Sequence, residues 1–286
     1  MGIAELVPGV SGGTIAFVTG IYLELVQALQ RLDRTFFGLL LRGRPAAAWN
    51  HVNGGFLLVL LAGMAIAVLA FSGLVAWLFE HREIQLWSFF FGLIVASAVF
   101  VGRSVAPWNL DRTALALAGV LAGAVISSAG GLPVSENPLV TLAAGAVAIC
   151  AWILPGVSGS FMLLLLGQYQ RVIRALAELD LLVIASLAAG CVLGLALFTR
   201  ALGWLLRHSY RGTLAFLCGF MIGSLQKLWP WRQTLSYYLD PHGDAIPVVV
   251  RPIGPFAFRE LYGEDPLLLG AGLACAAGLG VVMVLE

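Results

Sequence analysis

Charged residues are scarce in this chain of 286 residues: Asp, Glu, Lys and Arg together make up only 11% of it. A soluble domain carries about a quarter of its residues as charges, and these cover its water-facing surface. Here 60% of the residues are hydrophobic, and the mean hydropathy is +0.95. The net charge of +1 gives no sign of the basic surface of a nucleic-acid-binding protein. The composition therefore indicates an integral membrane protein.

Cysteine is also rare, and its spacing suggests no chemistry. The four cysteines lie singly in apolar runs, at Cys150, Cys191, Cys218 and Cys275. This pattern favours small packing residues over a disulfide or metal framework. A Walker loop, His-Glu-x-x-His and a Rossmann glycine pattern are all missing, so we expect neither a cofactor nor a metal. The first residues carry no basic segment ahead of a hydrophobic one, and we expect no cleavable signal peptide.

Long apolar blocks are abundant, and a helix needs roughly 17–25 such residues to cross a membrane. Blocks of this kind cover residues 55–79, 86–102, 113–131, 181–206, 213–229 and 267–286. A further apolar stretch, residues 138–166, is interrupted in its middle by Pro155 and two glycines. Proline removes a hydrogen-bond donor and clashes inside a helix. We therefore expect this stretch to form a re-entrant hairpin that enters and leaves on one side.

The sequence also repeats itself in two collinear blocks, which shared apolar composition explains poorly. Pro-Gly-Val-Ser-Gly occurs at residues 8–12 and again at 155–159, an offset of 147. At an offset of 127, Trp77, His81 and Gly92 match Trp204, His208 and Gly219. The smaller offset fits a longer loop in the first half, around residues 31–54.

Each half then contains one hairpin and three spans, and an odd number of spans inverts the second half. The predicted fold class is an all-α integral membrane protein of two inverted-topology repeats, each a re-entrant helical hairpin plus three transmembrane helices. The repeats are residues 1–131 and residues 132–286, which together form one transport domain. The first hairpin has only seven residues before Pro8, so it is half-formed or its N-terminal arm is missing from this chain; we favour the missing arm.

Arginine placement supports this topology, because cytoplasmic loops carry an excess of basic residues. The loops predicted inside hold Arg31, Arg34, Arg42, Arg44, Arg103, Arg112, Arg207 and Arg211. The loops at 80–85, 132–137 and 230–266 have at least as many acids as bases and are predicted outside. The exceptions are Arg171 and Arg174, which fall on the outer side.

The two breaks are the candidate binding site. Irregular backbone at membrane depth needs protein or a water cavity to satisfy it, and a helix that restarts there points N–H groups and a positive dipole at that cavity. Such an end binds anions without a buried lysine, and inverted transporter repeats build midplane sites in this way. The alternative is a simple kink or a small-residue packing contact. The candidate residues are Pro8, Gly9, Ser11, Gly12, Gly13, Thr14, Tyr22, Pro155, Gly156, Ser158, Gly159, Ser160 and Tyr169.

Charged residues near the breaks are further candidates, because a charge inside a membrane suggests function. Arg171 and Arg174 can share a helix face, and arginine binds two phosphate oxygens at once. Glu5 and Glu24 are candidates for ion coupling. The alternative for the arginines and for Glu24 is snorkelling at the interface. His81 and His208 each follow a tryptophan by four residues, which favours interfacial packing.

The segments Glu5-Leu-Val-Pro-Gly-Val-Ser-Gly-Gly-Thr14 and Ile153-Leu-Pro-Gly-Val-Ser-Gly-Ser160 closely resemble the DUF368 family. The resemblance implies a transporter that returns undecaprenyl phosphate from the outer to the inner leaflet of the bacterial cytoplasmic membrane. It also implies alternating access with possible H⁺ or Na⁺ coupling. The alternative is a membrane-embedded lipid phosphatase or another lipid-modifying enzyme, for which the sequence shows no nucleophile beside a base. A scaffold protein and an ion channel fit the paired breaks less well.

Overall fold

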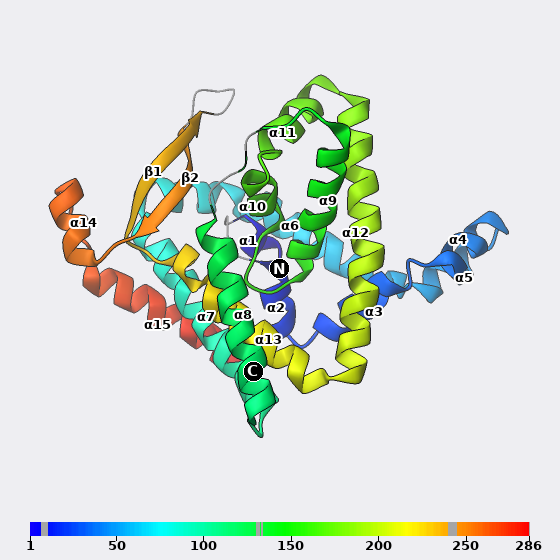
Figure 1. Ribbon diagram of the computed structural model, residues 1–286, viewed down its shortest axis with the longest axis horizontal. Coiled ribbons are helices and arrows are strands. Elements are labelled where there is room, and N and C mark those ends of the chain that lie inside the picture. Colours follow the sequence, from blue (N-terminus) through cyan, green and yellow to red (C-terminus); the bar gives the residue numbers. More distant parts are fainter. Residues whose placement is uncertain (7–10, 130–131, 133, 240–244, 286) are drawn as a thin grey trace.

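The computed structural model describes residues 1–6, 11–129, 132, 134–239 and 245–285, and most of them are helical (Figure 1). The first part of the chain forms α1 (Gly2–Glu5), α2 (Gly12–Val18), α3 (Tyr22–Gln30), α4 (Arg34–Leu41), α5 (Pro45–His51), α6 (Gly54–His81), α7 (Glu83–Val105) and α8 (Leu110–Ser128). The second part forms α9 (Pro138–Ile153), α10 (Gly159–Leu165), α11 (Tyr169–Glu178), α12 (Leu181–His208), α13 (Tyr210–Ser224), the 3-10 helix η1 (Leu225–Leu228), β1 (Arg232–Leu239), β2 (Ala245–Pro252), α14 (Pro255–Tyr262) and α15 (Leu268–Leu285).

The predicted apolar blocks coincide with α6, α7, α8, α12, α13 and α15. Among the described residues, α6, α7, α8 and α12 are long and apolar enough to cross a membrane. Helix α6 exposes large apolar side chains along its length, including Val59, Ile66 and Leu69. A soluble protein rarely leaves so large an apolar face in water. The exposed surface therefore agrees with the composition, and the protein is a helical membrane protein.

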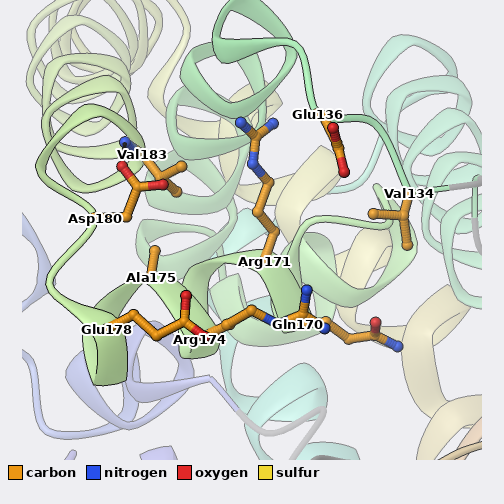
Figure 2. Close-up of a pocket in the computed structure, with 9 residues that line it drawn as sticks. All are labelled: Val134, Glu136, Gln170, Arg171, Arg174, Ala175, Glu178, Asp180 and Val183. Atoms are coloured by element: carbon orange, nitrogen blue, oxygen red, sulfur yellow. Dashed lines mark hydrogen bonds between the residues drawn. The ribbon is translucent and has the colours of Figure 1, made fainter.

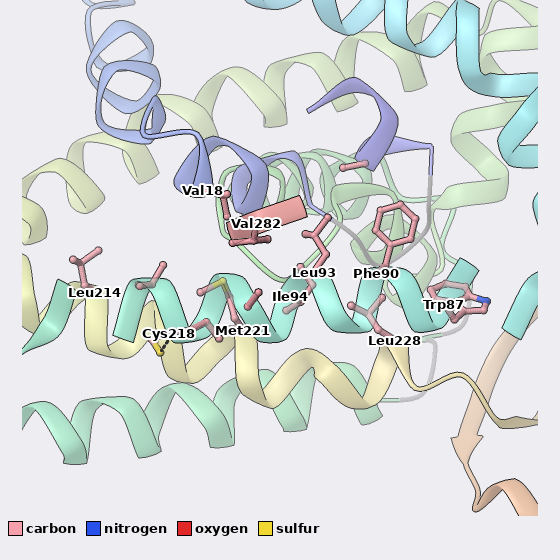
Figure 3. Packing of buried hydrophobic residues seen from close by; sticks show 14 of the residues in the cluster. Val18, Trp87, Phe90, Leu93, Ile94, Leu214, Cys218, Met221, Leu228 and Val282 are labelled. Carbon is pink, nitrogen blue, oxygen red and sulfur yellow. Dashed lines mark hydrogen bonds between the residues drawn. The ribbon is translucent and has the colours of Figure 1, made fainter. Parts of the chain in front are cut away.

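Helix α7 is the centre of the main core. Its buried face, which includes Phe90, Leu93 and Ile94, packs against Met221 of α13 and Val282 of α15 (Figure 3). Of its apolar window, 61% is buried inside the protein, compared with 6–17% for the other three long helices. The remaining long helices therefore keep most of their apolar surface available for lipid.

Matching glycines allow the closest helix contacts. A Cβ added to Gly92 of α7 would lie 2.1 Å from the carbonyl oxygen of Cys275 in α15. A Cβ added to Gly219 of α13 would lie 1.9 Å from the carbonyl oxygen of Ala116 in α8. Because no other residue fits at such a distance, α7 depends on glycine to meet α15, and α13 depends on it to meet α8. The two glycines are repeat partners at the offset of 127.

Other repeat partners also have matching local structure. Gly20, which follows α2, and Gly167, which follows α10, both have positive φ, at 74° and 65°. The His81 ring contacts Trp77, and the His208 ring contacts Trp204, with centroids 5.0 and 4.4 Å apart. In each pair the histidine Nδ1 lies within hydrogen-bonding distance of the tryptophan carbonyl oxygen. This is the packing role expected for both histidines.

Helices α9 and α10 lie against each other, with the break at residues 154–158 between them. The backbone N–H of Leu132, ahead of α9, donates to the carbonyl oxygen of Leu165 at the end of α10, at 2.7 Å. Thr141 in the first turn of α9 donates to Gln168 at 2.8 Å, and Gln168 donates to the carbonyl oxygen of Ser135. The chain thus turns at the break and returns to the end of α9 at which it began.

Two predicted loops contain regular structure. Residues 31–54 form α4 and α5, which project from the body of the protein (Figure 1). Residues 230–266 contain the antiparallel hairpin β1–β2 and helix α14, so the all-α prediction is wrong for this segment. The hairpin pairs Arg232 with Pro252 and Tyr237 with Pro247. Its strands are rich in Tyr and Val, residue types that favour a sheet. The sequence between them, Asp240-Pro-His-Gly-Asp244, was too polar to suggest a membrane span.

Candidate functional site

The two broken segments lie in direct contact. Ser11 donates its hydroxyl to the carbonyl oxygen of Leu154 at 2.9 Å, and the backbone N–H of Gly156 donates to the Thr14 hydroxyl at 3.1 Å. Gly13 approaches the second segment so closely that a Cβ on it would lie 2.5 Å from the carbonyl oxygen of Ile153. The predicted site residues Pro8 and Gly9 lie outside the described residues.

The N-terminus of α2 already has protein partners. The N–H of Gly12 donates to the Glu5 carboxylate at 2.9 Å, and the N–H of Gly13 donates to the Ser11 hydroxyl at 3.0 Å. Thr14 N–H donates to the carbonyl oxygen of Ser11. Ser11 is therefore the N-cap of α2. The expectation that these N–H groups are free is wrong, because a carboxylate of the chain takes the position that favours an anion.

The start of α10 is arranged differently. Ser158 occupies the N-cap position, but its hydroxyl lies 2.8 Å from the hydroxyl of Ser160 and makes no cap bond. Ser160 is exposed and lies inside α10, so it does not cap this helix. Gly156 has a φ of +93°, which a residue with a side chain rarely adopts. Pro155, Gly156 and Gly159 are buried, and they fix the turn of the chain between α9 and α10.

The two predicted tyrosines differ in environment. Tyr22 is buried and stacks on Phe17, with ring centroids 3.8 Å apart. Its hydroxyl has no hydrogen-bond partner among the described residues. Tyr169 begins α11 and is partly buried. Of the pair, only Tyr22 holds a buried polar group that lacks such a partner.

The two acidic candidates also differ. Glu5 is partly buried and binds the break through Gly12. Glu24 is exposed and accepts a hydrogen bond from the Asn53 side chain at 2.7 Å. Glu24 therefore connects α3 to the start of α6 at the surface, whereas only Glu5 contacts the break.

Arg171 and Arg174 line a surface pocket of about 350 Å³ along α11 (Figure 2). Arg171 donates to the carbonyl oxygen of Ser135 at 2.8 Å, and Figure 2 shows its side chain between Glu136 and Asp180. Glu178 also lines the pocket, so two arginines share it with three carboxylates. The structure thus brings the predicted arginines together, but in a pocket of net negative charge.

Two cations that the sequence analysis did not select lie in a second, more apolar pocket. Lys227 of η1 and Arg232 of β1 line a cavity of about 500 Å³ together with residues of α6 and α10. One signal was available in the sequence, because Lys227 is the single lysine of the chain. Arg232 lay in a predicted loop, where arginine is ordinary.

Comparison with known proteins places this chain in a family. Residues 1–246 match the family described as VCA0040-like, undecaprenyl phosphate translocase-like. The chain belongs to this VCA0040-like family. A polyprenyl-phosphate transporter of Vibrio cholerae serotype O1 is 38% identical over 286 residues, covering 100% of this chain and 93% of that protein. A polyprenyl-phosphate transporter of Staphylococcus aureus is 28% identical over 252 residues, covering 82% of this chain and 84% of that protein. No solved structure matches the chain.

Membership in the VCA0040-like family confirms the resemblance drawn from the paired motifs. The relatives are named as transporters, and the protein is a non-enzyme. Ser11 bonds to backbone groups, and Ser158 to the Ser160 hydroxyl, so among the described residues neither hydroxyl is paired with a base.

Proposed function

We propose that this protein transports undecaprenyl phosphate from the outer to the inner leaflet of the bacterial cytoplasmic membrane, where the lipid carrier is reused. The observation that carries the proposal is the direct contact between two helix breaks in a helical membrane protein of the VCA0040-like family. The relatives named polyprenyl-phosphate transporters support the substrate class. Movement between leaflets requires a site that opens to each side in turn, and paired breaks at a repeat interface can form one.

An inverted arrangement of residues 1–131 and 132–286 forms part of the proposal. It is supported by the exchange of partners between the halves: α7 of the first packs on α15 of the second, and α13 of the second packs on α8 of the first. The equivalent glycines Gly92 and Gly219 make these two contacts in the same way. Two copies related by a twofold axis in the membrane plane would produce this exchange.

A re-entrant position of α9 and α10 is the second part. The Leu132–Leu165 and Thr141–Gln168 hydrogen bonds support it, since both ends of this pair lie together. Helix α9 has 16 residues and α10 has seven, so α10 is far too short to cross the membrane by itself. The break then lies at the inner tip of the hairpin, where protein rather than lipid surrounds its backbone.

The phosphate would pass the region where Ser11, Thr14 and Gly156 meet, with Tyr22 and Tyr169 on the helices that follow. Glycine keeps side chains out of the contact between the breaks. The Tyr22 hydroxyl, which has no hydrogen-bond partner among the described residues, offers a donor. Arg171 and Arg174 would provide a second, weaker contact, since three carboxylates compete with phosphate for them. Glu5 is the better candidate for H⁺ or Na⁺ coupling because it contacts the break, whereas Glu24 lies on the surface.

The test is a surface-lipid measurement in cells. Outer-leaflet undecaprenyl phosphate is quantified in a bacterial strain whose own carrier transporters are removed, with and without this gene. We expect expression of the protein to lower the outer-leaflet pool. The level of undecaprenyl phosphate would stay unchanged if the protein moved another substrate.

A further inference from the structure

The cavity of about 500 Å³ lies between elements from both halves of the chain. Its walls include Leu6 ahead of the first break, Val75 and Phe79 of α6, and Phe161 of α10, while Lys227 and Arg232 supply its cations. Lipid and small-molecule sites are commonly apolar cavities of about this size with a few polar groups that fix orientation. We call this cavity the Lys227 pocket.

The two cations have different partners. The Lys227 ammonium lies 3.7 Å from the centre of the Phe161 ring, and no carboxylate pairs with it among the described residues. The Arg232 guanidinium lies 3.8 Å from the centre of a Trp87 ring and donates to Glu83 at 2.6 Å. Burial lowers the pKa of the Arg232 guanidinium, and the Glu83 carboxylate reverses this only in part. An anion in the pocket could therefore bind Lys227, which has no acidic partner among the described residues, and Arg232 beside it.

Charge distinguishes this pocket from the one around Arg171. Among the described residues, the lining of the Lys227 pocket holds two cations and no carboxylate, and the Glu83 carboxylate pairs with Arg232 from outside that lining. That carboxylate has a side chain 56% exposed, so water weakens its effect. The Arg171 pocket holds two cations and three carboxylates. Of these two cavities, the Lys227 pocket is the one that combines a positive charge with an apolar wall.

The pocket also adjoins both breaks. Leu6 lies two residues before the first motif, and Phe161 lies in the first turn of α10, two residues after the second. A head group held over Phe161 would contact the helix that starts at the second break. In the proposed topology, η1 lies at the outer end of the span at 213–229 and the β hairpin lies outside the membrane, on the side where the carrier lipid must be collected.

We propose that the Lys227 pocket is the outer-side binding site for the phosphate head group of the transported lipid. Lys227 and Arg232 bind the phosphate oxygens, and Phe79 and Phe161 contact the first isoprenoid units. A lysine takes phosphate as a compact charge, whereas arginine adds a planar pair of donors. This inference rests on the proposed function, because it takes polyprenyl phosphate as the ligand.

The single lysine makes the proposal directly testable. The full-length protein in nanodiscs is treated with an amine-reactive reagent, and modification of Lys227 is followed by mass spectrometry. We expect undecaprenyl phosphate to protect Lys227 from modification, while undecaprenol, which lacks the phosphate, does not. Protection by inorganic phosphate alone at equal concentration would instead identify a free-phosphate site and overturn the lipid assignment.

Binding of undecaprenyl phosphate to variants gives the second measurement. A hydrogen bond to a charged group is worth enough that Lys227→Met should weaken lipid binding roughly tenfold or more. Lys227→Arg keeps the charge and should restore most of the affinity. Glu83→Gln removes the anion that competes for Arg232, so it should leave lipid affinity unchanged or raise it. The matched control is Arg251→Gln, because Arg251 is exposed and follows the pocket residue Val250 in β2, on the opposite face of the strand.

The outcomes separate this inference from the proposed function. If wild-type protein and Lys227→Met bind and transport the lipid equally well, the pocket is not the head-group site and the transport proposal stands. If wild-type protein binds no undecaprenyl phosphate and moves none, both proposals are wrong. A variant that loses binding must still unfold at the wild-type temperature. Loss of binding together with a lowered unfolding temperature in both Lys227→Met and Lys227→Arg would assign Lys227 a structural role and overturn the inference.

Discussion

The backbone N–H of Gly156 donates to the Thr14 hydroxyl at 3.1 Å, although 142 residues separate the two. Both groups are buried, so no water replaces this bond if it is lost. Together with the bond from Ser11 to Leu154, it fixes the two broken segments to each other. A substitution in either break therefore alters contacts made by the other half of the chain.

Thr14→Val removes the acceptor of Gly156 while nearly keeping the side-chain volume. Leaving a buried N–H unpaired costs about 1–3 kcal/mol, so we expect a clear fall in unfolding temperature. The measurement is thermal unfolding of the purified protein in detergent. Thr19→Val is the matched control, because Thr19 is exposed and bonds only within its own helix turn. Equal effects of the two substitutions would mean that the bond between the breaks is unimportant.

Gly13→Ala tests the close approach of the breaks. The new methyl would meet the carbonyl oxygen of Ile153 at 2.5 Å, and overpacking of this kind costs about 1–3 kcal/mol. We expect lower stability and strongly reduced transport. In Gly38→Ala the methyl meets open space on an exposed helix, where alanine should be neutral or stabilising by about 1 kcal/mol. Full transport by Gly13→Ala would show that the breaks can separate without loss.

Glu5→Gln keeps an oxygen acceptor for the Gly12 N–H but removes the negative charge. We expect a stability loss within about 1 kcal/mol, the usual size of a charge–dipole contribution at a helix end. Transport in vesicles should lose its dependence on an H⁺ or Na⁺ gradient. Glu24→Gln is the control, because Glu24 lies at the surface away from the break. Gradient dependence that survives in Glu5→Gln would exclude Glu5 as the coupling residue.

Arg171→Ala combined with Arg174→Ala tests the negatively charged pocket. Three carboxylates line the same pocket and repel a phosphate, so we expect transport to fall by a smaller factor than in Lys227→Met. The control is Arg211→Ala, an exposed arginine on the predicted inner side. Wild-type transport would make both arginines membrane anchors. A larger loss than in Lys227→Met would make them the main head-group ligands.

The long helices could be predicted because the signal for each one, a long run of apolar residues, lies within the helix itself. Residues 55–79 and 181–206 were expected to span the membrane, and α6 and α12 cover both stretches. The sequence repeat could also be recognised, because Gly92 and Gly219 match at the offset of 127. In the structure these two glycines make equivalent contacts. The β hairpin was missed because its eight-residue strands are too short to be read as membrane-spanning helices and lie in a charged segment that hydropathy treats as a loop.

The site was harder to predict because its contacts join distant segments. Glu5 was selected as a charge near a break, but its bond to Gly12 depends on how α1 and α2 fold together. The Lys227 pocket forms only where α6, α10 and β1 pack together, and no spacing in the sequence predicts that these elements are neighbours. Composition marks Lys227 as unique but does not place it beside Phe161.

Transbilayer movement in liposomes of purified components tests the central claim most directly. The purified protein is reconstituted into liposomes that contain a fluorescent short-chain polyprenyl phosphate, and the fraction protected from an impermeant quencher is followed over time. We predict that wild-type protein exchanges the lipid between leaflets faster than empty liposomes do, and that Gly13→Ala strongly reduces the difference. Exchange no faster than in empty liposomes, under either an H⁺ or a Na⁺ gradient, would contradict the account.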